Sequence, residues 1–361
     1  MREVRRRAHR ALVVLLGTLA LLPKLAAAQA VQGRVTDLAT QRPIVGALVE
    51  LRAAATVIAS TLTTPSGTFL ISAPKQGSYD LRVAAIGYAP PPSLRVNLGA
   101  SGVTVPAFGL QRITISLPEL VVIGGQRGCR RTGLSDDTFG RLLESARTSL
   151  QVIEATIRSG EIGFEVEIVT TNTMFGNVRN YNTADTTYES FARWPVQSLE
   201  PDSLRRIGFS RHYWSAKTGE GRVYYGPDPR VLFADWFLQG HCFTLDRVSA
   251  QSDSLRIRFV PRGNNRLVDI SGTFVLDRTS LALLNLTFTH QRLPTGLSEG
   301  SAGGELEFER LESGLWITRD WAIWGPIERL RDDGGPPGMV GIVEVRGWVR
   351  RVVPGRAPGP N

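Results

Sequence analysis

The chain has few of the residues and few of the local motifs that mark catalytic sites. It holds two cysteines, four histidines and three methionines among 361 residues. The phosphate-loop, zinc-protease and paired C-x-x-C signatures do not occur in it. No short pattern therefore places several metal ligands together or forms a phosphate-binding loop. We expect no catalytic residue, no metal site and no cofactor.

Long apolar runs are also missing. The longest, Ala11 to Leu22, has twelve residues, whereas a membrane-spanning helix needs about 20. This run follows an arginine-rich start and precedes an alanine-rich stretch, the pattern of a cleavable secretory signal. We predict a signal peptide at 1–28, cut after Ala28 or Ala30, and no transmembrane span in the mature chain. The protein is then exported, to the periplasm, the outer-membrane surface or the medium.

A concentrated positive charge is missing once the signal is removed. The formal net charge is +9, but the signal holds six basic residues and one acidic residue, so the mature chain is nearer +4. The remaining arginines are interspersed with aspartate and glutamate. Nucleic-acid binding needs a basic stripe or patch, and none is present. We therefore expect no nucleic-acid partner.

The two cysteines, Cys129 and Cys242, are an even number in a chain expected to be exported. In an oxidising compartment this favours a disulfide between them. The alternative is a pair of unrelated buried thiols. A bridge would close a loop of more than 100 residues, which the chain-entropy account values at about 4–5 kcal/mol at most.

Residues 31–117 have the pattern of a small β-unit. Apolar and polar residues alternate over short stretches such as Val31 to Thr36 and Leu94 to Leu98, separated by turns rich in glycine, proline and serine. Alternation of this kind is typical of strands with one buried face. About seven such strands predict an antiparallel sandwich.

The same residues resemble a known family. The stretches GRVTDLATQRPIVGALVEL, from Gly33, and TTPSGTFLISAPKQGSYDLRVAAIGY, ending at Tyr88, are similar to the carboxypeptidase regulatory-like domain. The resemblance implies an immunoglobulin- or transthyretin-like sandwich of the carbohydrate-binding-like class. It also implies an accessory module that usually lacks catalytic residues. Gly67 and Gly87 of the pattern are expected in turns with positive φ.

The segment Leu117 to Gly125, LPELVVIGG, is similar to one that follows this domain in TonB-dependent outer-membrane receptors. There it leads into a plug and a large barrel. The chain after Gly125 is too short for both, since each spanning strand takes about 9–11 residues plus loops. We therefore interpret 118–134 as a linker, so that the resemblance is to the module and not to the transporter.

The pattern of residues 135–350 predicts a second, β-rich domain that begins with one long helix. Ser135 is a helix cap, apolar residues follow at helical spacing, and the helix ends near Gly160. Strands dominate afterwards, with short helices at Pro201–Ile207 and Pro229–Gln239. The expected fold class is mainly β: a sandwich, then a curved antiparallel sheet with one packed helix (α+β). The arrangement is faintly similar to the half-barrels of periplasmic lipoprotein carriers. We expect a disordered tail at 351–361.

Two groups of polar residues have both a functional and an ordinary interpretation. Glu305, Glu307 and Glu309 alternate with apolar residues. They could hold a cation or act on a glycosidic bond, but a solvated strand face explains them as well.

His241 and Cys242 are neighbours on a predicted strand, so their side chains point to opposite faces and cannot form a dyad. We interpret His241 as a polar surface residue.

Aromatic residues are dense in the second half of the chain and could stack on sugar rings, although each could equally belong to the core. Our candidates for ligand binding are Tyr224, Tyr225 and Trp236, which flank the predicted Pro229–Gln239 helix.

The sequence favours a non-enzymatic binding or structural module of the cell envelope, with a glycan or an outer-membrane protein as partner. The alternatives are an envelope-polymer hydrolase, which needs carboxylates or a Ser–His pair in a cleft, and a lipid or lipoprotein carrier with an apolar cavity.

Overall fold

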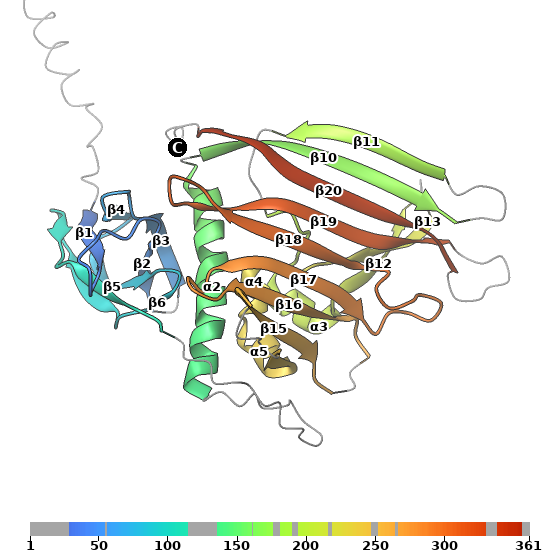
Figure 1. The fold of residues 1–361 in the computed structure, drawn as a ribbon, viewed down its shortest axis with the longest axis horizontal. Helices are drawn as coiled ribbons and strands as arrows, with labels where there is room; N and C mark the ends of the chain where they lie inside the picture. Colours follow the sequence, from blue (N-terminus) through green and yellow to red (C-terminus); the bar gives the residue numbers. More distant parts are fainter. Residues whose placement is uncertain are drawn as a thin grey trace, which may run out of the picture.

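The fold in Figure 1 is that of a computed structural model. It describes residues 29–54, 56–114, 136–160, 162–175, 181–189, 194–215, 219–246, 252–263, 266–329 and 338–355. The predicted signal peptide at 1–28, the predicted linker at 118–134 and the end of the predicted tail, 356–361, lie outside the described residues. The predicted fold class is confirmed: the protein is mainly β, with an N-terminal sandwich.

The sandwich unit is residues 29–114. Its strands are β1 (Gln29–Asp37), β2 (Leu48–Ala53), β3 (Thr56–Leu62), β4 (Thr68–Ala73), β5 (Gly77–Ala84), β6 (Tyr88–Ala89), β7 (Leu94–Leu98), β8 (Val103–Thr104) and β9 (Phe108–Arg112). One sheet has the order β3-β2-β5-β7; the other has the order β4-β1-β9-β6, with β8 beside β1. Residues alternate strictly between exposed and buried along β4. The inner faces of both sheets form one apolar core, as the alternation predicted.

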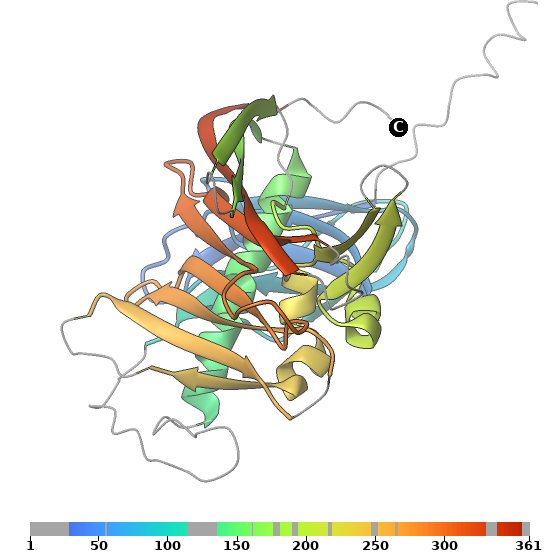
Figure 2. The ribbon, with the colours of Figure 1, turned by 90° about the vertical axis from the view of Figure 1, so that its right-hand side faces the viewer.

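The sheet unit, residues 136–355, is built on one large antiparallel sheet. Its strands are β10 (Ile162–Met174), β11 (Tyr181–Glu189), β14 (His241–Leu245), β15 (Ser254–Pro261), β16 (Asp269–Asp277), β17 (Leu283–Gln291), β18 (Gly303–Arg310), β19 (Trp316–Arg329) and β20 (Gly338–Pro354). The order is β11-β10-β20-β19-β18-β17-β16-β15-β14. The sheet curves around the elements packed on one of its faces (Figures 1 and 2).

Those elements are helices and one hairpin. They are α2 (Asp136–Ser159), α3 (Pro201–Ile207), α4 (Pro229–Leu232), α5 (Asp235–Gly240), and the hairpin of β12 (Ser210–Ser215) and β13 (Gly219–Tyr224). Their apolar residues form one large core with the inner face of the sheet. Among the side chains in this core, Phe237, Phe259 and Phe274 are fully buried.

Helix α2 is buried on two sides because it lies between the two units (Figure 1). Leu142, Leu150 and Ile153 face the core of the sheet unit. Val152 and Ala155 belong instead to a second, smaller cluster with Leu48 and Leu62 of the sandwich and Leu315 of the sheet unit. Each large apolar side chain buried there contributes about 1.5–3 kcal/mol of hydrophobic free energy. The two units are thus joined through a shared core around the helix.

Several boundaries differ from the sequence predictions. The predicted helix Pro229–Gln239 is two short helices, divided at Phe233 and Ala234. Asp228 caps the first of these helices, because its carboxylate accepts a hydrogen bond from the Val231 N–H at 2.9 Å. The predicted start of the tail at 351 was wrong: β20 continues to Pro354, since it pairs with the start of β10.

The interpretation of His241 as a surface residue was also wrong. Its side chain is 1% exposed and stacks on the Phe237 ring, with 3.8 Å between the ring centroids. Its ring nitrogens Nδ1 and Nε2 lie 2.9 and 3.0 Å from the carbonyl oxygens of Phe237 and Ile270. The imidazole is tolerated in the core because its N–H finds an acceptor in either tautomer.

Candidate functional site

Two glycines bring the backbones of the sandwich unit and the sheet unit into close contact. Gly87, at φ +78°, lies so near Ser280 that a Cβ atom there would stand 2.3 Å from the Ser280 carbonyl oxygen. Gly46, at φ +71°, lies in the same way against the carbonyl of Gly314, at 2.9 Å. Both positions combine a left-handed backbone with a lack of space, so only glycine fits. The positive φ predicted for Gly87, and that predicted for Gly67, are both confirmed.

Hydrogen bonds from helix α2 reinforce the first of these contacts. The Ser145 hydroxyl accepts from the Gly87 N–H at 3.3 Å and donates to the Leu281 carbonyl at 2.9 Å. It therefore ties one loop of the sandwich to one turn of the sheet unit. Nearby, Arg82 of the sandwich donates to the Glu144 carboxylate of the helix at 2.8 Å. The relative placement of the two units is defined by specific contacts as well as by apolar packing.

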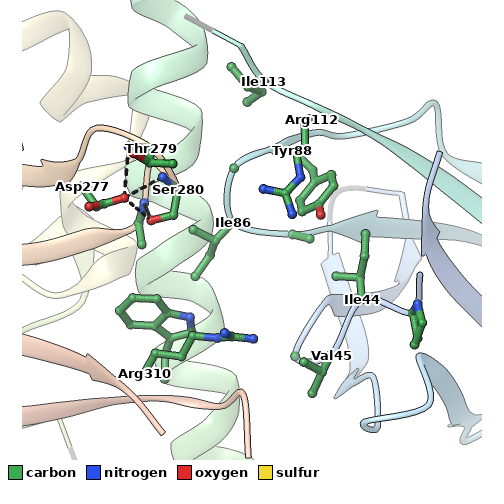
Figure 3. Close-up of a pocket in the computed structure, with 16 residues that line it drawn as sticks. Ile44, Val45, Ile86, Tyr88, Arg112, Ile113, Asp277, Thr279, Ser280 and Arg310 are labelled. Carbon is green, nitrogen blue, oxygen red and sulfur yellow. Dashed lines mark hydrogen bonds between the residues drawn. The ribbon is translucent and has the colours of Figure 1, made fainter. Parts of the chain in front are cut away.

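Between these contacts the two units leave a cleft of about 520 Å³, which we call the junction cleft. Residues from three segments of the sandwich and three of the sheet unit line it (Figure 3). The lining residues are Pro43, Ile44, Val45, Gly46, Ala85, Ile86, Gly87, Tyr88, Arg112 and Ile113 of the sandwich, with Asp277, Thr279, Ser280, Ala282, Arg310 and Trp316 of the sheet unit.

The sandwich wall of the junction cleft carries an ordered polar group. The Asp37 carboxylate, 5% exposed, lies behind the wall and accepts hydrogen bonds from the Tyr88 hydroxyl at 3.0 Å and from Arg112 Nε at 3.1 Å. The Arg112 guanidinium lies over the Tyr88 ring, 5.2 Å from its centroid. The Thr40 N–H and then Arg112 hold the pKa of Asp37 far below its usual range. Burial, and then the bond to Asp37, raise the pKa of Tyr88. At neutral pH the group is an aspartate, a neutral tyrosine and an arginine cation.

The opposite wall is formed by the β16–β17 turn and the end of β18. One oxygen of Asp277, Oδ1, accepts from the Thr279 N–H at 3.1 Å, from the Ser280 N–H at 2.6 Å and from the Ser280 hydroxyl at 2.7 Å. Burial alone would raise the pKa of Asp277, but these bonds outweigh it and the net shift is downward. Arg310 ends β18 and is paired across the ladder with Trp316 of β19. Both of these residues line the junction cleft.

The predicted ligand-binding residues lie elsewhere, at the end of β13 and on α5. The Tyr224 hydroxyl donates to the Glu328 carboxylate at 2.7 Å, and burial followed by this bond raises the pKa of Tyr224. Tyr225 is 6% exposed, with its ring in the core. Trp236 packs against Phe209 and Phe237. A role in ligand binding for these three residues stays a prediction.

A second polar cluster surrounds Tyr224. Arg222 of β13 donates to the Ser210 hydroxyl at 3.1 Å, contacts the His212 ring, and lies 3.9 Å from Glu328. His290 is 2% exposed and hydrogen-bonds the Tyr225 carbonyl at 2.9 Å; burial lowers its pKa. The cluster attaches the β12–β13 hairpin to the sheet, although Arg222 Nε and His290 Nδ1 are buried without a hydrogen-bond partner among the described residues.

The other sequence candidates are resolved in part. Glu305, Glu307 and Glu309 are exposed while Leu306 and Phe308 between them are buried, which confirms the solvated strand face. Cys242 lies on β14, but Cys129 is outside the described residues, so the disulfide stays a prediction. The described part of the chain holds no group of three His, Cys, Asp or Glu residues placed to bind a metal ion.

Sequence reasoning did not find the junction cleft. Tyr88 and Gly87 were noticed only as parts of the family pattern, and Arg112 and Arg310 were not noticed at all. These residues are separated by up to about 220 positions in the chain, and only the docking of the two units brings them together. No spacing within the sequence carries that information.

Comparison with known proteins identifies the first unit. Residues 30–118 match the family model of the carboxypeptidase regulatory-like domain, so the predicted resemblance is confirmed for this part of the chain. No curated protein matches the chain. No helix among the described residues is both long and apolar enough to cross a membrane.

The solved structures that resemble the chain are remote. A 9R-lipoxygenase from Cyanothece PCC8801 is 11% identical, with a TM-score of 0.20; the match covers 78% of this chain but only 42% of the lipoxygenase. A DUF1329 family protein from Desulfovibrio piger ATCC 29098 is 7% identical, with a TM-score of 0.25, over 60% of this chain and 94% of that protein. Neither likeness is strong enough to indicate a function.

Proposed function

We propose that the protein is an exported, non-enzymatic binding module of the cell envelope, and that it holds an envelope glycan in the junction cleft. The carboxypeptidase regulatory-like domain favours a binding or structural role over catalysis. The arginine-rich start, short apolar run and alanine-rich stretch of residues 1–28 favour export.

The observation that carries the proposal is the cleft itself. It measures about 520 Å³ and is lined by both units. Small-molecule sites commonly lie at domain junctions, in concave spaces that combine apolar walls with a few placed polar groups. Here the apolar part includes Ile44, Ala85 and Ile86, and the polar part includes Arg112, Ser280 and Arg310 (Figure 3).

The lining residues fit a sugar better than a purely apolar ligand. Trp316 and Tyr88 supply aromatic surface at the cleft, and sugar rings pack against such surfaces through their C–H faces. Hydroxyls and guanidinium groups beside them can hydrogen-bond sugar hydroxyls. The Asp37–Tyr88–Arg112 group and the Asp277 turn are already ordered by internal hydrogen bonds. Little side-chain conformational entropy is then lost on binding, which favours affinity.

The test of the site is a variant that fills the cleft without removing any packing. Thr279 is exposed at the cleft, so Thr279→Trp places an indole in it; Ser298→Trp adds the same group at an exposed turn residue that does not line the cleft. We expect wild-type protein and Ser298→Trp to be retained on at least one column of an immobilised panel of neutral and acidic oligosaccharides. Thr279→Trp should pass through the same column.

Three outcomes contradict parts of the proposal. If no oligosaccharide retains the wild type, glycan binding is wrong; if Thr279→Trp is retained equally, the site is elsewhere. Shortening of any panel member by the purified protein, detected by mass spectrometry, overturns the non-enzymatic assignment. Export is tested separately by N-terminal sequencing of the mature protein, which should begin at Gln29 or Val31 and not at Met1.

A further inference from the structure

We infer that the ligand of the junction cleft is an acidic sugar, and that Arg112 and Arg310 hold its carboxylate or phosphate group from opposite walls. This inference rests on the proposed function and specifies its ligand. In Figure 3, Arg112 comes from the sandwich and Arg310 from the sheet unit, on either side of the same space.

Arg310 carries a charge that nothing in the described structure neutralises. Within the described residues its guanidinium has neither a hydrogen-bond acceptor nor an ion-pair partner, although it borders the cleft. Gly314 lies close by: a Cβ atom there would stand 2.6 Å from Val45 Cγ1 and 3.3 Å from Arg310 Nη2. A planar, permanently charged donor of this kind matches carboxylate and phosphate oxygens.

Arg112 is held in place with donors to spare. Its bond to Asp37 uses Nε, and its plane lies over the Tyr88 ring. These contacts and an interaction with the Tyr88 hydroxyl fix the guanidinium, while the hydrogen bond to Asp37 occupies Nε alone. A ligand oxygen can therefore bind an arginine that is already oriented, so little rotamer entropy is lost.

The acidic residues near the cleft do not compete strongly for these cations. Asp37 lies behind the sandwich wall and accepts from Thr40, Tyr88 and Arg112. Asp277 is the one carboxylate that lines the cleft, and its Oδ1 is taken up by the Thr279 and Ser280 turn. The two arginines are the cations that line the cleft, while Asp277 remains an anion there. Both arginines are exposed to solvent, so salt screens their attraction for an anion.

The experiment compares three probes of similar size by isothermal titration calorimetry: trigalacturonate, the neutral galactotriose, and a trisaccharide bearing one phosphate ester. We expect at least one acidic probe to bind and galactotriose to bind about tenfold more weakly or not at all, as for the loss of a charge-assisted contact. Comparing the two acidic probes tells whether the natural group is a carboxylate or a phosphate. Raising NaCl from about 0.1 M to about 1 M should weaken binding, because the Debye length shortens from about 10 Å to about 3 Å.

The decisive variant is Arg310→Gln, which removes the charge but keeps much of the side chain's length. Its matched control is Arg266→Gln, since Arg266 is also exposed and has no partner among the described residues, but it does not line the cleft. Arg310→Gln should weaken the binding of the acidic probe about tenfold, while Arg266→Gln should leave it unchanged. Circular dichroism of both variants should match that of the wild type.

The possible failures separate the two proposals. If galactotriose binds as tightly as the acidic probes and Thr279→Trp abolishes both, the cleft binds glycans but the inference of an acidic ligand is wrong. The same conclusion follows if binding of the acidic probe is lost in Thr279→Trp and retained in Arg310→Gln. If no probe binds, and the oligosaccharide panel also retains nothing, the proposed function itself is wrong.

Discussion

Replacing Gly87 with alanine should separate the two units while leaving each unit's own core intact. A left-handed backbone costs a non-glycine residue about 1–2 kcal/mol. The new methyl group would also stand 2.3 Å from the Ser280 carbonyl oxygen. Relieving that collision means moving the loop away from the turn, at a cost of about 1–3 kcal/mol for overpacking. The movement also loses the Gly87–Ser145 hydrogen bond, worth about 1 kcal/mol.

The total expected destabilisation of the Gly87→Ala variant is about 3–6 kcal/mol. Gly263 provides the control, since it has φ +70° but nothing within 4 Å of the position of a Cβ atom. Gly263→Ala should therefore cost only the backbone part, about 1–2 kcal/mol. The difference between the two variants isolates the contact between the units from the cost of the backbone conformation.

Urea unfolding followed by two signals measures this difference. All seven tryptophans lie at or after Trp194, so intrinsic fluorescence follows the sheet unit, while far-ultraviolet circular dichroism follows both units. Hydrogen exchange adds a local signal at Leu281 and Leu283, next to the contact. Gly87→Ala should unfold at lower urea than Gly263→Ala and exchange faster there. Equal destabilisation in the two variants would refute the close contact on which the junction cleft depends.

Three further predictions concern other parts of the chain. Gly67→Val should destabilise the sandwich by about 2–4 kcal/mol, because a β-branched residue at φ +74° meets the Val35 carbonyl. Separate melting of the two units measures this destabilisation, and an equal loss of stability in both units contradicts the domain boundary. Asp37→Asn should lower the melting temperature at pH 7. The pKa of Asp37 is depressed in the folded state, so the stability that its carboxylate contributes is present above the unfolded pKa of about 3.9 and is lost as the pH falls below that value. A difference in melting temperature between wild type and variant that does not change with pH contradicts this assignment. Non-reducing mass spectrometry should find one peptide pair linked through Cys129 and Cys242, whereas two alkylatable thiols in the native protein would exclude the bridge.

The sandwich and the long helix could be predicted because their signals are local. Alternation along β1 and β4, turn residues such as Gly67, and the family pattern all lie within short windows. Helix α2 was predicted from one apolar stripe. Its second buried side could not be predicted, because Ser145 and Ser149 look like surface residues in the sequence. In the structure both are buried, and they hydrogen-bond backbone groups of the β16–β17 turn and of β17.

The missed elements have weak or non-local signals. Strand β11 reads YNTADTTYE, which has little apolar content because it is the edge of the sheet. The β12–β13 hairpin is attached through Arg222 and Tyr224 to Glu328, about 100 residues away. The junction cleft depends on Arg112 and Arg310 lining one space from two different units, which no local pattern encodes.

The central claim, that the junction cleft holds an acidic sugar, is tested most directly by a crystal structure of the mature protein with trigalacturonate. The account predicts ligand density between the two units, with a carboxylate within hydrogen-bonding distance, about 2.7–2.9 Å, of the Arg112 and Arg310 guanidinium groups. Sugar bound at Tyr224, Tyr225 and Trp236, or an empty junction cleft in crystals whose protein binds the sugar in solution, would contradict it.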